Sequence, residues 1–254
     1  QLFNHHMVDD NTTLKLVVEE IALIQQGRAS ELPAPAPFRH FVAQARLGAS
    51  RAEHEAFFGQ LLGDVQDTTA PFNLLDVRGD GLDAEALRLP LDEALSAQVR
   101  QQAQRHGVSA ATLFHLAWAL VVARTAGKDD VVFGTVLFGR MQGGERALGL
   151  FINTLPLRIR LGAQTVEECL RQTHAALSGL LHHEHASLSL AQRCSGLSGG
   201  APLFTSLLNC RHAAQSRKET SEAWPGMEIV GSRERSNYPV AMSVDDLGEG
   251  FEIG

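Results

Sequence analysis

The segment DVVFGTVL, residues 130–137, constrains the fold of this chain more than any other feature. It is a nearly continuous run of β-branched and other apolar residues, the pattern of a strand that is buried on both faces. Segments of helical and of strand periodicity alternate along the rest of the chain. The sequence therefore predicts an α/β fold or a mixed α+β sandwich, and no internal repeat is visible.

Helix signals are strong at several points. A capping box opens one helix at Ser50–Glu53 and another at Thr165–Glu168, and Asp10 or Asn11 is expected to cap the first helix. The expected helices are 11–26, 38–47, 50–62, 92–106, 110–126 and 165–182. The expected strands are 2–6, 86–91, 130–137, 151–161, 203–210 and two within 229–244, with residues 241–254 forming a hairpin that stops inside its second strand.

Composition excludes several classes of protein. Apolar residues make up 44% and charged residues 20% of the 254 residues, which is typical of a globular chain. The net charge of −7, without a long basic run, argues against a nucleic-acid partner. The longest uncharged stretch, 106–123, is shorter than the ~20 residues of a membrane span, and no signal peptide is visible. The three cysteines are far apart, so we expect a reducing, cytoplasmic location.

The densest cluster of reactive side chains is HHMVDD, which contains His5, His6, Asp9 and Asp10. It lies at a predicted strand-to-helix turn, a place where ligands often bind. A histidine can accept a proton near neutral pH, and an aspartate four residues later can brace the loop through hydrogen bonds or an arginine. From the residues alone, a surface turn with a capped helix, a metal site and a general base all remain open, although the third and fourth metal ligands are missing.

A second histidine cluster, His182, His183 and His185, follows a predicted helix. Such residues complement the dipole at a helix C-terminus, and their spacing is not that of a zinc site. We therefore expect no structural metal there. The Gly-rich stretch 139–149 matches neither nucleotide-binding fingerprint, which argues against a phosphate cradle.

HHMVDDN, residues 5–11, resembles the HHxxxDG signature of the condensation domains of nonribosomal peptide synthetases. These belong to the chloramphenicol acetyltransferase-like acyltransferases, whose HxxxD core would be His6 to Asp10. Further segments resemble elements of the same family in the same order. They are FRHFVAQ (38–44), DVVFGTVLFGR (130–140), LGLFINTLPLR (148–158), HHEHASLSLAQ (182–192), APLFTSLLN (201–209) and SNYPVAMSV (236–244).

The resemblance implies a domain of two similar lobes with a tunnel between them. Residues 1–83 would then be the end of the N-lobe with the catalytic loop and a connector, and residues 84–254 most of the C-lobe, incomplete at its C-terminus. The 254 residues would be a fragment of the domain, and we expect this fragment to be inactive by itself.

The activity implied is amide-bond formation by an acyltransferase. Upstream and downstream peptidyl carrier domains would present a donor acyl or peptidyl thioester and an acceptor aminoacyl thioester on phosphopantetheine arms, with an adenylation domain in the same assembly line. The domain itself would bind no cofactor. By the resemblance His6 is the catalytic histidine, His5 and Asp10 support its loop, Arg140 is the counter-ion of Asp10, and Asn209 is a tunnel-facing asparagine.

Two departures from the family pattern leave the subtype open. Asn11 replaces the glycine of the signature, and asparagine tolerates left-handed backbone angles better than most residues. The family's HQDxPFE element is HHEHASL here, without the aspartate and proline. An epimerising or dehydrating enzyme of the same fold, or a docking domain without catalysis, therefore remains an alternative to condensation.

Overall fold

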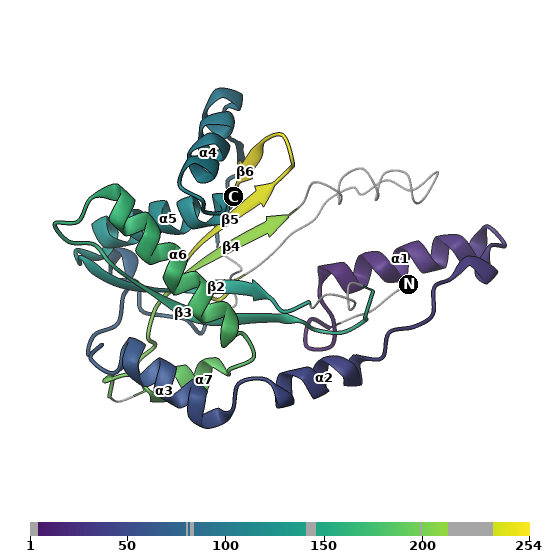
Figure 1. Cartoon of the computed structure of the whole chain (residues 1–254), viewed down its shortest axis with the longest axis horizontal. Coiled ribbons are helices and arrows are strands. Elements are labelled where there is room, and N and C mark those ends of the chain that lie inside the picture. Colours follow the sequence, from purple (N-terminus) through teal and green to yellow (C-terminus); the bar gives the residue numbers. More distant parts are fainter. Residues whose placement is uncertain (1–4, 80, 82–83, 141–145, 199, 213–235) are drawn as a thin grey trace.

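The computed structural model describes residues 5–79, 81, 84–140, 146–198, 200–212 and 236–254 (Figure 1). Its helices are α1 (Asn11–Gln25), α2 (Phe38–Leu47), α3 (Arg51–Leu62), α4 (Glu93–Arg105), α5 (Ala110–Ala126), α6 (Val166–His182) and α7 (Leu188–Arg193), with short 3-10 turns at Ala29–Glu31 and Pro71–Asn73. Its strands are β1 (Leu89–Pro90), β2 (Asp130–Phe138), β3 (Ile152–Arg160), β4 (Ser206–His212), β5 (Val240–Asp246) and β6 (Phe251–Ile253).

The described strands form one mixed sheet in the order β1-β6-β5-β4-β2-β3. Strands β2, β4 and β5 are parallel, whereas β3 runs antiparallel to β2 and β6 antiparallel to β5. The β2–β3 ladder is the longest and pairs Asp130 with Arg160 at one end and Phe138 with Ile152 at the other. The connection that follows Phe138 carries Arg140, so this end of the ladder positions the site described below.

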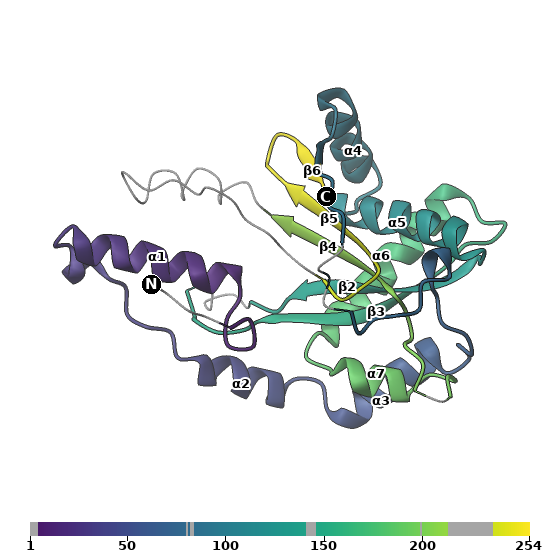
Figure 2. The same cartoon turned by 180° about the vertical axis from the view of Figure 1, so that it is seen from behind.

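Helices α5 and α6 pack beside each other against β2 and β3, and α7 packs between α3 and β3. Helices α1 and α2 instead lie beyond the end of the β2–β3 ladder, as Figures 1 and 2 both show. Helix α2 contains no buried residue. Helix α2 therefore contributes no buried side chain to the core.

The core lies between the sheet and its helices. The largest fully buried side chains are Phe58, Phe133, Leu62, Leu155, Leu157, Leu180, Leu203, Leu208, Val122, Val131, Val132 and Thr69. Phe58 and Leu62 belong to α3, so this helix shares one core with the strands. The expected lobe boundary between residues 83 and 84 stays a prediction, and the packing of α3 joins residues on both sides of it.

Most predicted elements are confirmed, and the helices agree to within a residue or two at their ends. Both capping boxes are present, Asp10 caps α1, and the hairpin of β5 and β6 is formed. Cys169, Cys194 and Cys210 are free thiols.

Several expectations about short elements are wrong. The strand expected at 86–91 is only Leu89–Pro90, because it lies at the sheet edge and its leucines are exposed. Residues 6–8 form a turn instead of ending a strand, and residues 2–4 lie outside the described part. Within 229–244 the structure contains β5, and residues 229–235 are not described. Helix α7, with a Ser187 cap, was not predicted because six residues are too few to establish a periodicity.

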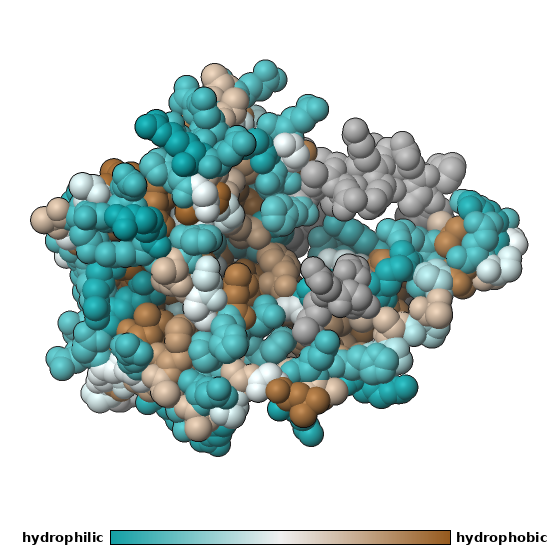
Figure 3. Space-filling model, in the orientation of Figure 1, coloured by the Kyte–Doolittle hydropathy of each residue, from teal (hydrophilic) through white to brown (hydrophobic). Residues whose placement is uncertain are grey.

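The surface carries no continuous apolar face in the view of Figure 3, which is mainly hydrophilic with separate hydrophobic patches. No single helix among the described residues is long and apolar enough to cross a membrane. In the described part of the chain, only α4 and α5 taken together pass that test of length and composition, and they meet at a bend of 107°.

Buried histidines tie helices to the core. The Nδ1 of His115 donates to the Ala111 carbonyl at 2.6 Å, so Nε2 accepts from the Thr135 hydroxyl at 2.7 Å. His54 of α3 and His183 after α6 join their Nδ1 atoms at 2.9 Å, which requires at least one neutral ring as acceptor. Burial lowers the pKa of His54 and His183, and it lowers the pKa of His115 to about 4.

We predict that the chain loses stability as the pH falls from about 6.5 towards 4. The unfolded chain binds protons at its histidines near pH 6.5, whereas the folded chain resists protonation until the pH reaches the lowered pKa values. For His115 the pKa of about 4 corresponds to a loss on the order of 3 kcal/mol. Urea unfolding of the purified chain at several pH values measures this loss.

The variant His115→Gln identifies the source of the effect. It should be less stable at pH 7.5 but show a flatter pH dependence, whereas the exposed control His40→Gln should keep the wild-type slope. A His115→Gln variant with the full wild-type pH slope would contradict the prediction.

Candidate active site

The histidine loop, residues 5–10, is a tight turn. Its hydrogen bonds determine which ring nitrogen of His5 and of His6 carries the proton. The Val8 amide donates to the His5 carbonyl at 2.9 Å, and the Met7 amide donates to His5 Nδ1 at 3.1 Å. His6 Nδ1 donates to the Asp9 carbonyl at 2.7 Å. Because a carbonyl oxygen only accepts, the proton of neutral His6 lies on Nδ1 and the lone pair on Nε2. Both rings are exposed, so Nε2 of His6 can accept a proton from a bound substrate.

Asp10 closes the loop and starts α1. Its carboxylate is buried, and Oδ1 accepts from the Thr13 amide at 2.8 Å, which caps the helix. Its Oδ2 accepts from the Phe151 amide at 3.4 Å. Asn11 is the first residue of the helix and does not have a positive φ. The backbone at Asn11, where the signature has glycine, therefore does not adopt left-handed angles.

The predicted pair of Asp10 and Arg140 is present. Nη2 of Arg140 lies 2.6 Å from Asp10 Oδ1 and 2.9 Å from the Thr13 hydroxyl, and Nη1 donates to the Ala147 carbonyl at 2.7 Å. The guanidinium carbon lies 4.3 Å from the centroid of the Phe151 ring. Both side chains of the pair are shielded, with 13% of Arg140 and 4% of Asp10 exposed. This ion pair joins the start of α1 to the connection between β2 and β3.

Thr13 is a residue of this site that the sequence did not reveal. Its hydroxyl donates to the Gly149 carbonyl at 2.8 Å and accepts from the Gly149 amide at 3.0 Å and from Arg140. It thus locks α1 to the segment before β3 at two backbone atoms. A threonine at the third position of a helix capped by aspartate was the available signal, but its partners are more than a hundred residues away in the chain.

Asn209 lies in β4 opposite Ser243 of β5. Its Oδ1 is buried and has no hydrogen-bond partner among the described residues. In the described part of the chain, no hydrogen bond joins it to His6, Asp10 or Arg140. The structure therefore joins the loop that carries His5, His6 and Asp10 to Arg140, and among the described residues no hydrogen bond ties Asn209 to this group.

Two side chains of the second histidine cluster pack against phenylalanine rings. Helix α6 ends at His182, His183 is its C-cap, and the His183 ring stacks on Phe57 with centroids 4.1 Å apart. The His185 ring packs edge-on against Phe41 of α2 at 5.2 Å. Among the described residues no group of three or more His, Cys, Asp or Glu side chains is placed to hold a metal ion. That this cluster binds no metal stays a prediction.

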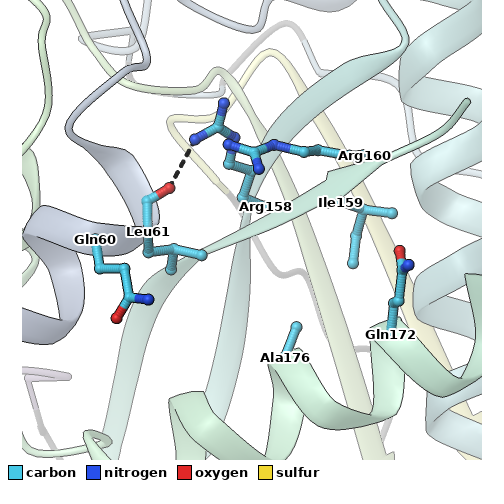
Figure 4. A pocket seen from close by; sticks show the side chains of 7 residues that line it. All are labelled: Gln60, Leu61, Arg158, Ile159, Arg160, Gln172 and Ala176. Carbon is cyan, nitrogen blue, oxygen red and sulfur yellow. Dashed lines mark hydrogen bonds between the residues drawn. The ribbon is translucent and has the colours of Figure 1, made fainter.

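The pocket in Figure 4 has a volume of about 210 Å³, and no residue of the histidine loop lines it. Arg158, which lines it, is seven residues along β3 from Phe151, or about 23 Å at the rise of a strand. All N–H donors of Arg158 are bonded, to Asp64, Asp130 and the Leu61 carbonyl. Hydrogen bonds from Arg158 hold the pKa of Asp64 at about 2. Arg158 serves the fold, because all its N–H groups are bonded to carboxylates and a carbonyl of the chain itself.

Comparison with known proteins matches residues 2–254 to the family model of the condensation domain. The chain belongs to the condensation domain family. Its relatives include malpinin synthetase and malpibaldin synthetase of Mortierella alpina, which are 51% identical over 247 residues and 49% identical over 252 residues. These alignments cover 96% and 98% of this chain but 3% and 4% of the two synthetases. A nonribosomal peptide synthetase of Aspergillus ustus is 28% identical over 244 residues.

Solved structures confirm the chloramphenicol acetyltransferase-like fold. The first condensation domain of the calcium-dependent antibiotic synthetase, in complex with a substrate analogue, matches with a TM-score of 0.71 at 22% identity. The X-domain from teicoplanin biosynthesis matches with a TM-score of 0.69 at 20% identity. Each alignment covers 98% of this condensation domain chain, and 56% and 61% of the respective solved chains.

We predict that Asp10→Ala destabilises the chain by about 3–5 kcal/mol, because it leaves the guanidinium of Arg140 without its carboxylate in a shielded site. His6→Ala should cost far less, since the His6 ring is exposed. Urea unfolding of the two variants compares these losses. Asp10→Asn, which retains an oxygen to cap α1, should lie between them, and equal stability of Asp10→Ala and His6→Ala would contradict the assignment.

We also predict that Gly149→Ala loosens α2, because a Cβ on Gly149 would overlap the Phe38 ring. Overpacking of this kind costs about 1–3 kcal/mol. Limited proteolysis of residues 38–47 and the urea midpoint measure the effect, with Gly162→Ala as control because its Cβ would enter open space. The double variant Phe38→Ala with Gly149→Ala should lose less than the sum of the single variants, and simple additivity would argue against the clash.

Proposed function

We propose that this condensation domain forms an amide bond between a carrier-bound donor thioester and the amine of a carrier-bound acceptor. The observation that carries the proposal is the orientation of the His6 ring. Its Nδ1 is anchored to the Asp9 carbonyl, which leaves the basic Nε2 exposed on a loop that Arg140 ties to the sheet. Relatives named as peptide synthetases support the same class of reaction.

In the proposed step the acceptor nitrogen attacks the carbonyl carbon of the donor thioester. A C–N bond forms and the C–S bond breaks, so the products are an amide and the thiol of the donor arm. The proton lost by the amine passes to Nε2 of His6 and returns to the leaving thiolate. A positioned acid–base group of this kind contributes about 10²–10⁴-fold in rate.

The remaining site residues have supporting roles in this proposal. Asp10 and Arg140 hold the loop, and the Met7 amide bonded to His5 Nδ1 holds the turn. Asn209 is proposed as a tunnel-facing residue on the family resemblance alone, and its buried Oδ1 has no hydrogen-bond partner among the described residues. None of these side chains needs to move during the step, which suits a site that works by holding two reactants in place.

The proposed partners are peptidyl carrier domains on either side and an adenylation domain of the same assembly line. The phosphopantetheine arms belong to the carriers, so the domain needs no cofactor of its own, and we place the protein in the cytoplasm. The chain spans 56% of the solved condensation domain cited above, so the assay uses the full-length protein. We expect the 254 residues alone to give no product.

We predict that His6→Ala lowers amide formation by at least about 10²-fold in the full-length protein while the fold is kept. Carrier domains loaded with donor and acceptor are mixed with the protein, and the products are measured by mass spectrometry. His40→Ala, which removes another exposed histidine, is the matched control and should keep wild-type turnover.

The same assay separates the alternatives. A dipeptidyl thioester supports condensation, a donor of inverted configuration would indicate epimerisation, and loss of water from a Ser or Thr residue would indicate dehydration. If the wild-type protein gives none of these products, a docking domain without catalysis is the alternative that remains. Near-wild-type rates for His6→Ala would refute the role of this histidine.

A further inference from the structure

Phe151 contacts both members of the ion pair that holds the histidine loop. Its ring lies under the Arg140 guanidinium at 4.3 Å, and its backbone amide donates to Asp10 Oδ2 at 3.4 Å. Phe151 as a whole is 4% exposed. Two rings of α2, Phe38 and Phe41, meet it edge-on with centroids 5.2 Å and 4.7 Å away. Two side chains of α2 therefore support the ring from its edges.

This arrangement restricts the orientation of Arg140. A guanidinium is a planar fork, and when its face stacks on a ring its N–H groups point sideways. With its carbon over the Phe151 ring, the fork donates to Asp10, Thr13 and the Ala147 carbonyl at the same time. Displacement of the fork would weaken at least one of these bonds. The ring thus supports the position in which Arg140 holds the loop to the sheet.

We propose that Phe151 is a positioning residue for the reaction, acting on His6 through Arg140 and Asp10. The proposal rests on the proposed function and extends it to a residue that touches neither substrate nor reacting atoms. A loop that is held less tightly places His6 less accurately, and misplacement by about 1 Å can cost about 10²-fold in rate. Loss of the ring should therefore reduce kcat and leave substrate binding nearly unchanged.

The chain contains a matched control for this interaction. Phe251 of β6 is 2% exposed and lies under the guanidinium of Arg100, also at 4.3 Å. Arg100 pairs with Asp246 at 2.6 Å, and the Phe114 ring meets Phe251 edge-on at 4.9 Å. In the sheet, β5, β4 and β2 lie between β6 and β3. Phe251 thus reproduces the stacked arginine, the ion pair and the aromatic support at a site away from the histidine loop.

The experiment compares Phe151→Leu with Phe251→Leu in the full-length protein, with carrier-loaded substrates. We expect kcat to fall about tenfold or more for Phe151→Leu, with KM within about twofold of wild type, and kcat to stay within about twofold for Phe251→Leu. Phe151→Tyr keeps the aromatic face and should recover most of kcat. Equal losses for the two leucine variants, or no recovery by tyrosine, would overturn the proposal.

Hydrogen exchange measured by mass spectrometry tests the positioning without any turnover. Amides of residues 5–13 should exchange faster in Phe151→Leu than in wild type, and at the wild-type rate in Phe251→Leu. Unchanged exchange of this loop in Phe151→Leu would overturn the inference. If wild type makes no product while the loop loosens as expected, the proposed function fails and the structural coupling stands.

Discussion

The buried carboxylate of Asp10 is the interaction on which the site depends. It caps α1 through Thr13, accepts from Arg140 after β2, and accepts from the Phe151 amide before β3. A buried carboxylate without such partners would be very costly, so its presence requires all three segments to assemble. The loop that carries His6 is thereby fixed to the sheet by a residue that need not touch a substrate.

The sheet supplies the rigidity that this arrangement needs. Strands β2 and β3 pair along nine residues each, and their shared end carries the connection with Arg140 and Phe151. At the opposite end of the ladder, Arg158 of β3 donates to Asp130 of β2 and to Asp64, which follows α3. These bonds join α3 and the turn after it to the two strands. Two arginines therefore hold the two ends of one hairpin, one for the fold and one for the proposed active site.

Helices α1 and α2 contribute few buried side chains to the structure. The aromatic side chains of α2 meet Phe151 and His185, although no residue of α2 is buried. Helix α5, in contrast, is apolar around most of its surface and lies in the core. This difference explains why the histidine loop relies on a small number of specific polar and aromatic contacts instead of on a large buried area.

Local sequence determined the helices, their caps and the spacing of His6 and Asp10, because capping and periodicity act within a few residues. It also sufficed for the family resemblance that led to Arg140. Contacts that join distant segments were decided by the tertiary structure. Thr13 bonds Gly149 and Arg140, and His54 meets His183, across more than a hundred residues in each case. No local pattern encodes such partners, because they become neighbours only when the sheet has brought the ends of its strands together.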